Sequence, residues 1–123
     1  MFSVIMYDVI TIGSATFDVF AKTEAELITI TSHNSKEELI AYPSGSKILM
    51  KSLHFSVGGG GTNTAVAISR LGLKAAYLGN IGKDDHGRKV LDTLKKEGVD
   101  FIGTISEDMT NYSVILDSND EDR

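Results

Sequence analysis

Two groups of residues in this chain have the chemical types and the spacing of a ligand-binding site. One is the carboxylate of Asp18, which follows Gly13 in a Gly-x4-Asp pattern. The other is a run of four consecutive glycines, residues 58–61, followed two positions later by Asn63. A carboxylate accepts hydrogen bonds from hydroxyl groups, and an amide side chain both donates and accepts them. Asp18 therefore predicts a grip on vicinal hydroxyls such as those of a sugar, and the alternative is an aspartate of a turn or helix cap.

The glycine run precedes a segment with the pattern of a helix. Residues 64–71 carry small or apolar side chains at helical spacing, and Gly72 stands in the position of a C-terminal cap. The glycines thus lead into a helix N-terminus, whose free N–H groups and positive dipole favour an anion or a cluster of oxygen acceptors. The alternative is a glycine-rich loop that only permits tight packing between a strand and a helix.

Two known phosphate-binding fingerprints fail at this stretch. The pattern G-x-G-x-x-G, begun at Gly58, requires glycine where Asn63 stands. The P-loop pattern fails around Lys83, because Tyr77 occupies the upstream glycine position and Asp84 follows the lysine. These failures weaken an ordinary dinucleotide-binding or P-loop interpretation, including that of a fragment of a nucleotide-binding oxidoreductase.

Composition narrows the class of protein further. With 123 residues, 41% of them hydrophobic and 24% charged, the chain is one domain or a piece of one. It has no run of about 18 apolar residues and no signal-peptide pattern, so we expect no membrane partner. The absence of cysteine and the net charge of −5 favour a cytoplasmic location and disfavour nucleic-acid binding. His86 has no partner at metal-ligand spacing, so no metal site is predicted.

The elements that would position these residues read as an α/β core with an inserted β segment. Residues 7–12 form an apolar run typical of a strand buried on both faces of a parallel sheet, and Asp18 lies beyond its carboxyl end. Residues 20–57 lack a helical period and predict a small β-sheet. The further elements expected are strands at 75–81, 99–105 and 112–116 and a helix at 87–97 that begins after Asp84 or Asp85.

The order of these motifs resembles the N-terminal part of the ribokinase-like, or PfkB-type, carbohydrate kinases. The resemblance rests on Gly-x4-Asp at residues 13–18, the G-G-x-G-x-N loop at 58–63 and G-x-D-x-x-G at 82–87, each followed or preceded by the expected elements. It implies a parallel-sheet core with helices on both faces and a small β-sheet lid. By position, residues 1–19 and 58–111 would belong to the core, and residues 20–57 and 112–123 would be lid strands.

The resemblance also implies roles for individual residues. Those matching its substrate-binding positions are Thr16, Asp18, Gly59, Gly60, Gly61 and Asn63. Thr16 and Gly60 stand where ribokinases proper have asparagine and lysine, so the resemblance leaves the substrate open among sugars, sugar phosphates and nucleosides. Such kinases use ATP and Mg²⁺, and their lid often forms a homodimer.

The residues that would carry catalysis are expected outside this sequence. In the family, the catalytic aspartate, the anion hole and the adenine site lie in a C-terminal half with a G-A-G-D-like motif, and nothing in these residues matches it. We therefore expect a fragment without kinase activity of its own, with no catalytic residue in this chain. Two alternatives stay open: a chain that ends naturally at Arg123, and a non-catalytic sugar- or nucleoside-binding module or assembly partner.

Overall fold

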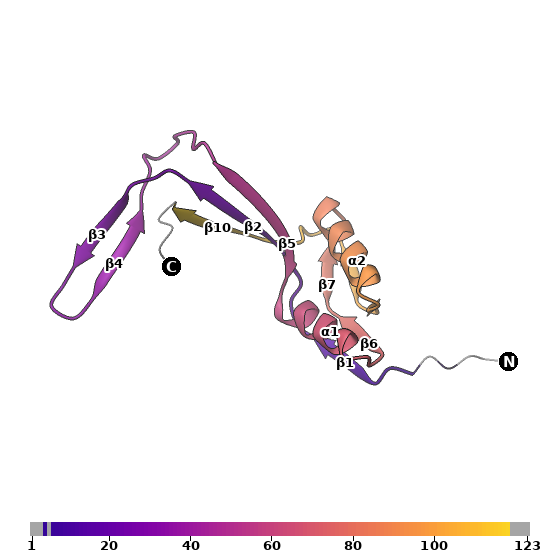
Figure 1. The fold of residues 1–123 in the computed structure, drawn as a ribbon. Coiled ribbons are helices and arrows are strands. Elements are labelled where there is room, and N and C mark those ends of the chain that lie inside the picture. The colour runs from indigo at the N-terminus through magenta and orange to yellow at the C-terminus, as the bar shows by residue number, and fades with distance from the viewer. Residues whose placement is uncertain (1–3, 5, 119–123) are drawn as a thin grey trace. The chain divides into compact units, whose positions relative to one another are not determined.

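The computed structural model describes residue 4 and residues 6–118 (Figure 1). The elements are β1 (Val9–Ile12), β2 (Thr16–Thr23), β3 (Leu27–Thr31), β4 (Lys36–Ile40), β5 (Ser52–Gly58), α1 (Gly60–Arg70), β6 (Ala75–Leu78), β7 (Asn80–Gly82), α2 (Asp85–Lys96), β8 (Asp100–Phe101), β9 (Thr104–Ser106) and β10 (Asn111–Ser118). Neither helix is long and apolar enough to cross a membrane, within the described residues.

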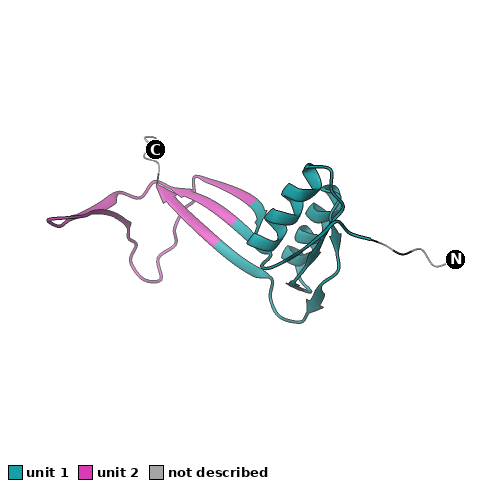
Figure 2. Cartoon of the chain, turned by 90° about the horizontal axis from the view of Figure 1, so that it is seen from below, with its two compact units in different colours: residues 1–18, 56–113 teal, residues 19–55, 114–123 magenta. Residues whose placement is uncertain are grey.

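The chain divides into two compact units (Figure 2). Unit 1 comprises residues 1–18 and 56–113, and unit 2 comprises residues 19–55 and 114–123. The predicted core at 1–19 and 58–111 and the predicted lid at 20–57 and 112–123 reach into residues 1–3, 5 and 119–123, which lie outside the described residues. The functional assignment of the units as a core and a lid stays a prediction.

Unit 1 is built on a parallel sheet with the strand order β1-β6-β8. In the register of β1 and β6, Val9 lies opposite Ala75 and Ile12 opposite Leu78. A second parallel pair is formed by β7, which follows β6 in the chain, and β9, which follows β8. The connections between the parallel strands contain α1 and α2, as expected for an α/β fold. The predicted fold class, α/β with a parallel sheet, is confirmed.

One face of this sheet carries the hydrophobic core. The buried cluster joins Ala65 of α1, Tyr77 of β6, and Val90 and Leu94 of α2, each at most 1% exposed. The expectation that the first strand is buried on both faces is wrong for this chain, because Ile12 is 77% exposed. Helix α1 packs on the side of β1 that bears Thr11, whose hydroxyl donates to the Gly61 carbonyl at 2.9 Å. The alternate side chains of β1, such as that of Ile12, lie on the other face.

Both helices are close to their predicted places. Helix α1 begins at Gly60 and so includes two of the four glycines, four residues earlier than its apolar stripe indicated. Helix α2 begins after Asp84, which is its N-cap residue as predicted. The Asp84 carboxylate accepts hydrogen bonds from the Gly87 N–H at 2.7 Å and from the Thr110 N–H at 2.8 Å. These backbone donors lower the pKa of Asp84 to about 2. Asp84 thus fastens the start of α2 to the residue that precedes β10.

Unit 2 contains the antiparallel pair β3 and β4, in which Leu27 lies opposite Ile40. A second three-stranded sheet has the order β10-β2-β5. Strand β2 is the element that the sequence interpretation missed, since it placed Asp18 beyond the end of the first strand and began the inserted β segment at residue 20. The alternating burial of Phe17, Val19 and Ala21, each at most 4% exposed, is the period of a half-buried strand.

Candidate functional site

Strand β2 carries two of the predicted site residues, Thr16 and Asp18, at alternate positions. Alternate residues of a strand point to the same face, and both side chains are half-buried. Asp18 is anchored from a second strand, because the Ser113 hydroxyl on β10 donates a hydrogen bond to Asp18 Oδ1. The carboxylate therefore lies in a strand and not in the turn after β1, and it is held from the side by β10.

The other carboxylate oxygen lies against the first glycine of the run. A Cβ atom added to Gly58 would collide with Asp18 Oδ2 and would lie 3.0 Å from Thr16 Oγ1. The missing side chain of Gly58 thus makes room for the Asp18 carboxylate. The buried Thr62 hydroxyl, 2.6 Å from the Gly58 carbonyl, fixes the loop from the helix side. The structure brings Thr16, Asp18 and the start of the glycine loop together.

Gly59 and Gly61 are required by the structure of the loop itself. Gly59 has φ +105°, and a Cβ atom there would lie 2.8 Å from Ala15 Cα. A Cβ atom on Gly61 would lie 2.6 Å from Tyr77 Cε2 and 2.9 Å from the Gly13 carbonyl carbon. The loop therefore packs backbone against backbone on the turn after β1, which is the tight-packing alternative that the sequence left open.

The expectation of free N–H groups at the start of α1 is wrong for three of them. The Gly60 N–H donates to Ser14 Oγ at 3.2 Å. The N–H groups of Gly61 and Thr62 donate to the Ser14 carbonyl at 3.1 and 3.4 Å. The turn after β1 folds over the helix start, so Ser14 accepts the bonds that a bound anion would otherwise receive.

Gly60 and Asn63 are the members of the motif that face open space. No atom lies within 4 Å of the position that a Cβ atom on Gly60 would take. Asn63 is exposed, and its backbone N–H donates to the Gly59 carbonyl at 2.9 Å in the helix. These two positions leave room beside the loop, whereas Gly59 and Gly61 are closely packed.

Sequence reasoning missed two residues of this arrangement, Ser14 and Ser113. Ser113 lies in the segment 112–116, which the sequence interpretation predicted as a strand without a site residue. Strand periodicity could have indicated Ser113, because β10 begins directly after Thr110, whose hydroxyl donates to the Asp84 carboxylate. Ser14 gave no comparable signal, because its role is to accept bonds from a distant helix.

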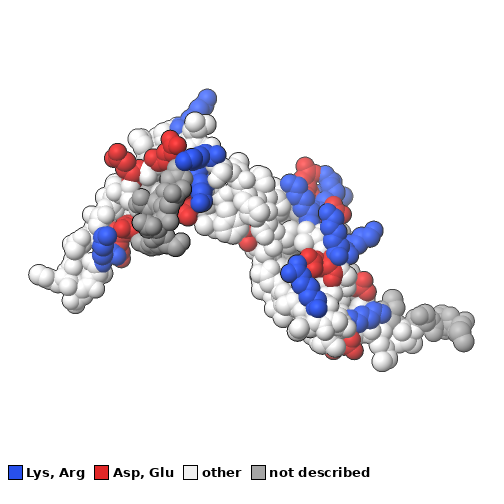
Figure 3. All heavy atoms as spheres, in the orientation of Figure 1, with Lys and Arg blue, Asp and Glu red and all other residues white. Residues whose placement is uncertain are grey.

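Helix α2 carries charged side chains of both signs. In the face shown, Lys and Arg alternate with Asp and Glu over the helices of unit 1 (Figure 3). Among residues 4 and 6–118 no group of three or more His, Cys, Asp or Glu side chains is placed to hold a metal ion. His86 stacks instead on Phe17, with ring centroids 4.6 Å apart.

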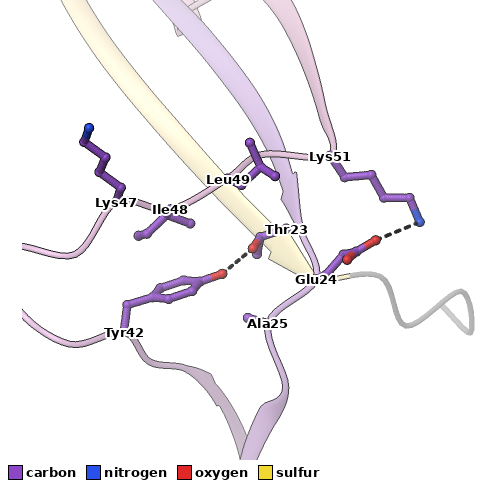
Figure 4. A pocket seen from close by; sticks show the side chains of 8 residues that line it. All are labelled: Thr23, Glu24, Ala25, Tyr42, Lys47, Ile48, Leu49 and Lys51. Atoms are coloured by element: carbon purple, nitrogen blue, oxygen red, sulfur yellow. Dashed lines mark hydrogen bonds and ion pairs between the residues drawn. The ribbon is translucent and has the colours of Figure 1, made fainter.

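Unit 2 has a hollow of its own, of about 370 Å³ (Figure 4). Thr23 and Tyr42 share a hydrogen bond on one side of it, and Lys51 Nζ lies 3.8 Å from Glu24 Oε1 on the other. The ion pair is solvent-exposed, and such pairs contribute little to stability. The hollow contains none of the predicted site residues.

Comparisons with known proteins show which family this chain resembles. The profile of the pfkB family carbohydrate kinase matches residues 6–123. Ribokinase from Haemophilus influenzae is 31% identical over 94 residues, covering 72% of this chain and 31% of that protein. Fructokinase-2 from Oryza sativa subsp. japonica is 39% identical over 67 residues, covering 52% of this chain and 20% of that protein.

Solved structures share the fold. Arabidopsis thaliana ribokinase, solved in complex with ribose and ATP, superposes with a TM-score of 0.75 at 21% identity over 94% of this chain and 34% of that chain. The ribokinase-like fold inferred from the sequence is confirmed. The chain thus spans about a third of the length of these ribokinases.

Proposed function

This chain belongs to the pfkB family of carbohydrate kinases, and we propose that it forms the N-terminal, substrate-binding portion of an ATP-dependent kinase that phosphorylates a hydroxyl group of a sugar, sugar phosphate or nucleoside. The observation that carries the proposal is that the Asp18 carboxylate lies against Gly58, the first glycine of the loop, in unit 1. A carboxylate held in one orientation is suited to accept hydrogen bonds from substrate hydroxyls.

The other predicted residues have supporting parts in this proposal. Thr16, on the same face of β2 as Asp18, adds a hydroxyl that donates and accepts. Asn63 and the open space at Gly60 form the part of the loop that a substrate can approach. Gly59 and Gly61 shape the loop by packing on the turn after β1, so their contribution to binding is indirect.

The phosphoryl-transfer machinery is proposed to lie outside this chain. ATP and Mg²⁺ belong to the reaction of the family, and the described residues offer no cluster that fits a metal ion. Transfer depends on positioning and on electrostatic stabilisation of transition-state charge. A chain without a catalytic base or an anion hole should bind substrate without consuming ATP.

Unit 2 is proposed to act as the lid and to associate with a second copy. On β3, Ile28 and Ile30 are each 51% exposed and lie on one face. Leu39 of β4, which lies opposite Ile28 in the register, adds a third apolar side chain at 43% exposure. An isolated two-stranded hairpin is only marginally stable in water, so cover for this face would stabilise it.

Calorimetric titration tests the proposal. The chain is titrated with a panel of pentoses, hexoses, sugar phosphates and nucleosides, beside a coupled assay for ATP consumption. We expect saturable binding by at least one compound without turnover. Absence of binding by a folded chain would contradict the substrate-binding role, and turnover would contradict the assignment of catalysis to residues outside the chain.

A further inference from the structure

Ser113 is the one hydrogen-bonding partner that a second strand supplies to Asp18 among the described residues. Its hydroxyl on β10 donates to Asp18 Oδ1, and the two residues are far apart in sequence. An ionised carboxylate only accepts hydrogen bonds, so a donor on one oxygen fixes the orientation of the whole group. Hydrogen bonds to a charged acceptor are also stronger than those between neutral groups.

The two oxygens of Asp18 have different surroundings. Oδ1 accepts a hydrogen bond from the Ser113 hydroxyl, whereas Oδ2 lies so close to Gly58 that it would collide with a Cβ atom there. Rotation of the carboxylate away from this position would break the bond to Ser113. The pair of Ser113 and Gly58 therefore selects one rotamer of Asp18.

The position of Ser113 is itself fixed from α2. Thr110, 1% exposed, donates its N–H and its hydroxyl to the Asp84 carboxylate at 2.8 and 2.7 Å. The Thr110 hydroxyl also accepts from the Gly82 N–H at 2.9 Å. β10 begins at the next residue, so Ser113 stands three positions along a strand whose start is anchored by three hydrogen bonds.

We propose that Ser113 is a positioning residue of the substrate site: it orients the Asp18 carboxylate so that Oδ2 is presented beside Gly58 to a substrate hydroxyl. This inference rests on the proposed function. Because Ser113 occupies one acceptor position of Oδ1, Asp18 holds a single hydroxyl through Oδ2 more readily than two vicinal hydroxyls through both oxygens.

The test compares Ser113→Ala, Ser113→Thr and the control Ser56→Ala. Ser56 is a half-buried strand serine whose hydroxyl bonds only to the neighbouring Val57 carbonyl, at 3.4 Å, within the described chain. We expect Ser113→Ala to weaken binding of the best compound of the panel by about tenfold or more, as for loss of a hydrogen bond to a charged group. Ser113→Thr, which keeps the hydroxyl, and Ser56→Ala should bind like the wild type.

A measurement without substrate accompanies the titrations. The side-chain carboxyl carbon of Asp18 is observed by NMR at neutral pH in each protein, and the hydroxyl proton of Ser113 is sought in the wild type. We expect the Asp18 resonance to move in Ser113→Ala and to stay in Ser56→Ala. The rate at which the Ser113 hydroxyl proton exchanges with water is compared in the wild type and in Asp18→Ala. Equal rates in the two proteins would overturn the inference, even if Ser113→Ala fails to fold.

The outcomes separate the two proposals. If the wild type binds a compound and Ser113→Ala binds it equally well, the inference is overturned and the proposed function stands. If the wild type binds nothing, the proposed function is overturned together with the substrate role of Ser113. Weaker binding in Ser113→Ala and recovery in Ser113→Thr support both.

Discussion

The two units of this chain use their apolar residues in opposite ways. In unit 1, Tyr77, Val90 and Leu94 are at most 1% exposed and form one cluster with the helices. In unit 2, large side chains such as Leu49 at 91% and Leu53 at 52% remain exposed. Unit 1 has an interior that fixes the glycine loop, whereas unit 2 is strands with little interior of its own. The surroundings of Asp18 are therefore specified within unit 1, whereas the proposed association with a second copy would cover exposed apolar side chains of unit 2.

The difference also explains which glycines matter. Around unit 1, Gly59 and Gly61 are enclosed by backbone atoms, and Gly60 of the same run faces open space. In unit 2, Gly45 has φ +76° but nothing within 4 Å of its Cβ position. In a densely packed interior, a glycine is required because a Cβ atom would collide with neighbouring atoms. Where no atoms are near, only the positive φ of the turn favours glycine.

Substitution of Gly61 should have the largest effect on stability, because it disrupts the close packing of unit 1. Gly61→Ala places a methyl group 2.6 Å from Tyr77 Cε2 and 2.9 Å from backbone carbon of Gly13. We expect a loss of about 1–3 kcal/mol in the free energy of unfolding, measured by urea denaturation followed by circular dichroism. Gly60→Ala is the matched control for stability and should unfold like the wild type. Equal stability of both variants would contradict the described packing of the loop.

Removal of the Asp84 carboxylate should have a smaller effect on unit 1. Asp84→Ala deletes the N-cap of α2 and the partner of Thr110, for an expected loss of about 1–2 kcal/mol at neutral pH. The pKa of Asp84 is lowered from 3.8 to about 2, so its contribution is complete above the unfolded pKa and is lost as the pH falls through the folded pKa. The difference between wild type and variant should therefore shrink between about pH 4 and pH 2. A constant difference across that range would show that the carboxylate charge is not responsible.

The smallest effect on folding is expected in unit 2. Ile28→Glu alters an exposed side chain of β3 and should change the free energy of unfolding by no more than about 0.5 kcal/mol. It should nevertheless abolish self-association in sedimentation velocity runs over a range of concentrations. Thr29→Glu, on the opposite face of the same strand, is the control. Association that persists in Ile28→Glu would remove this face from the proposed lid contact.

The sequence predicted those parts of the fold that depend on local patterns. The N-cap at Asp84, the two helices and the parallel strands follow from capping chemistry and periodicity. Strand β2 was missed because the turn residues before Thr16 obscured its short alternation. The bonds from Gly60 and Gly61 to Ser14, and from Ser113 to Asp18, join positions far apart in the chain, and no local rule specifies such pairs.

The candidate site shows the same division. The residue types at Asp18 and Asn63 pointed to a polar ligand, and the motif order pointed to the kinase family. The structural roles of the individual glycines could be assigned only from the folded structure, because identical residues in one run have different neighbours. Their roles in substrate binding remain predictions.

The most direct test of the central claim is a parallel titration of the wild type and Asp18→Ala with the compound that binds best. Asp18 is a half-buried strand residue outside the hydrophobic cluster, so its removal should leave the thermal transition near that of the wild type. The account predicts saturable binding by the wild type and none by Asp18→Ala at the same concentrations. Equal binding by a folded Asp18→Ala would contradict the account, because it would place the substrate away from the carboxylate around which the site is built.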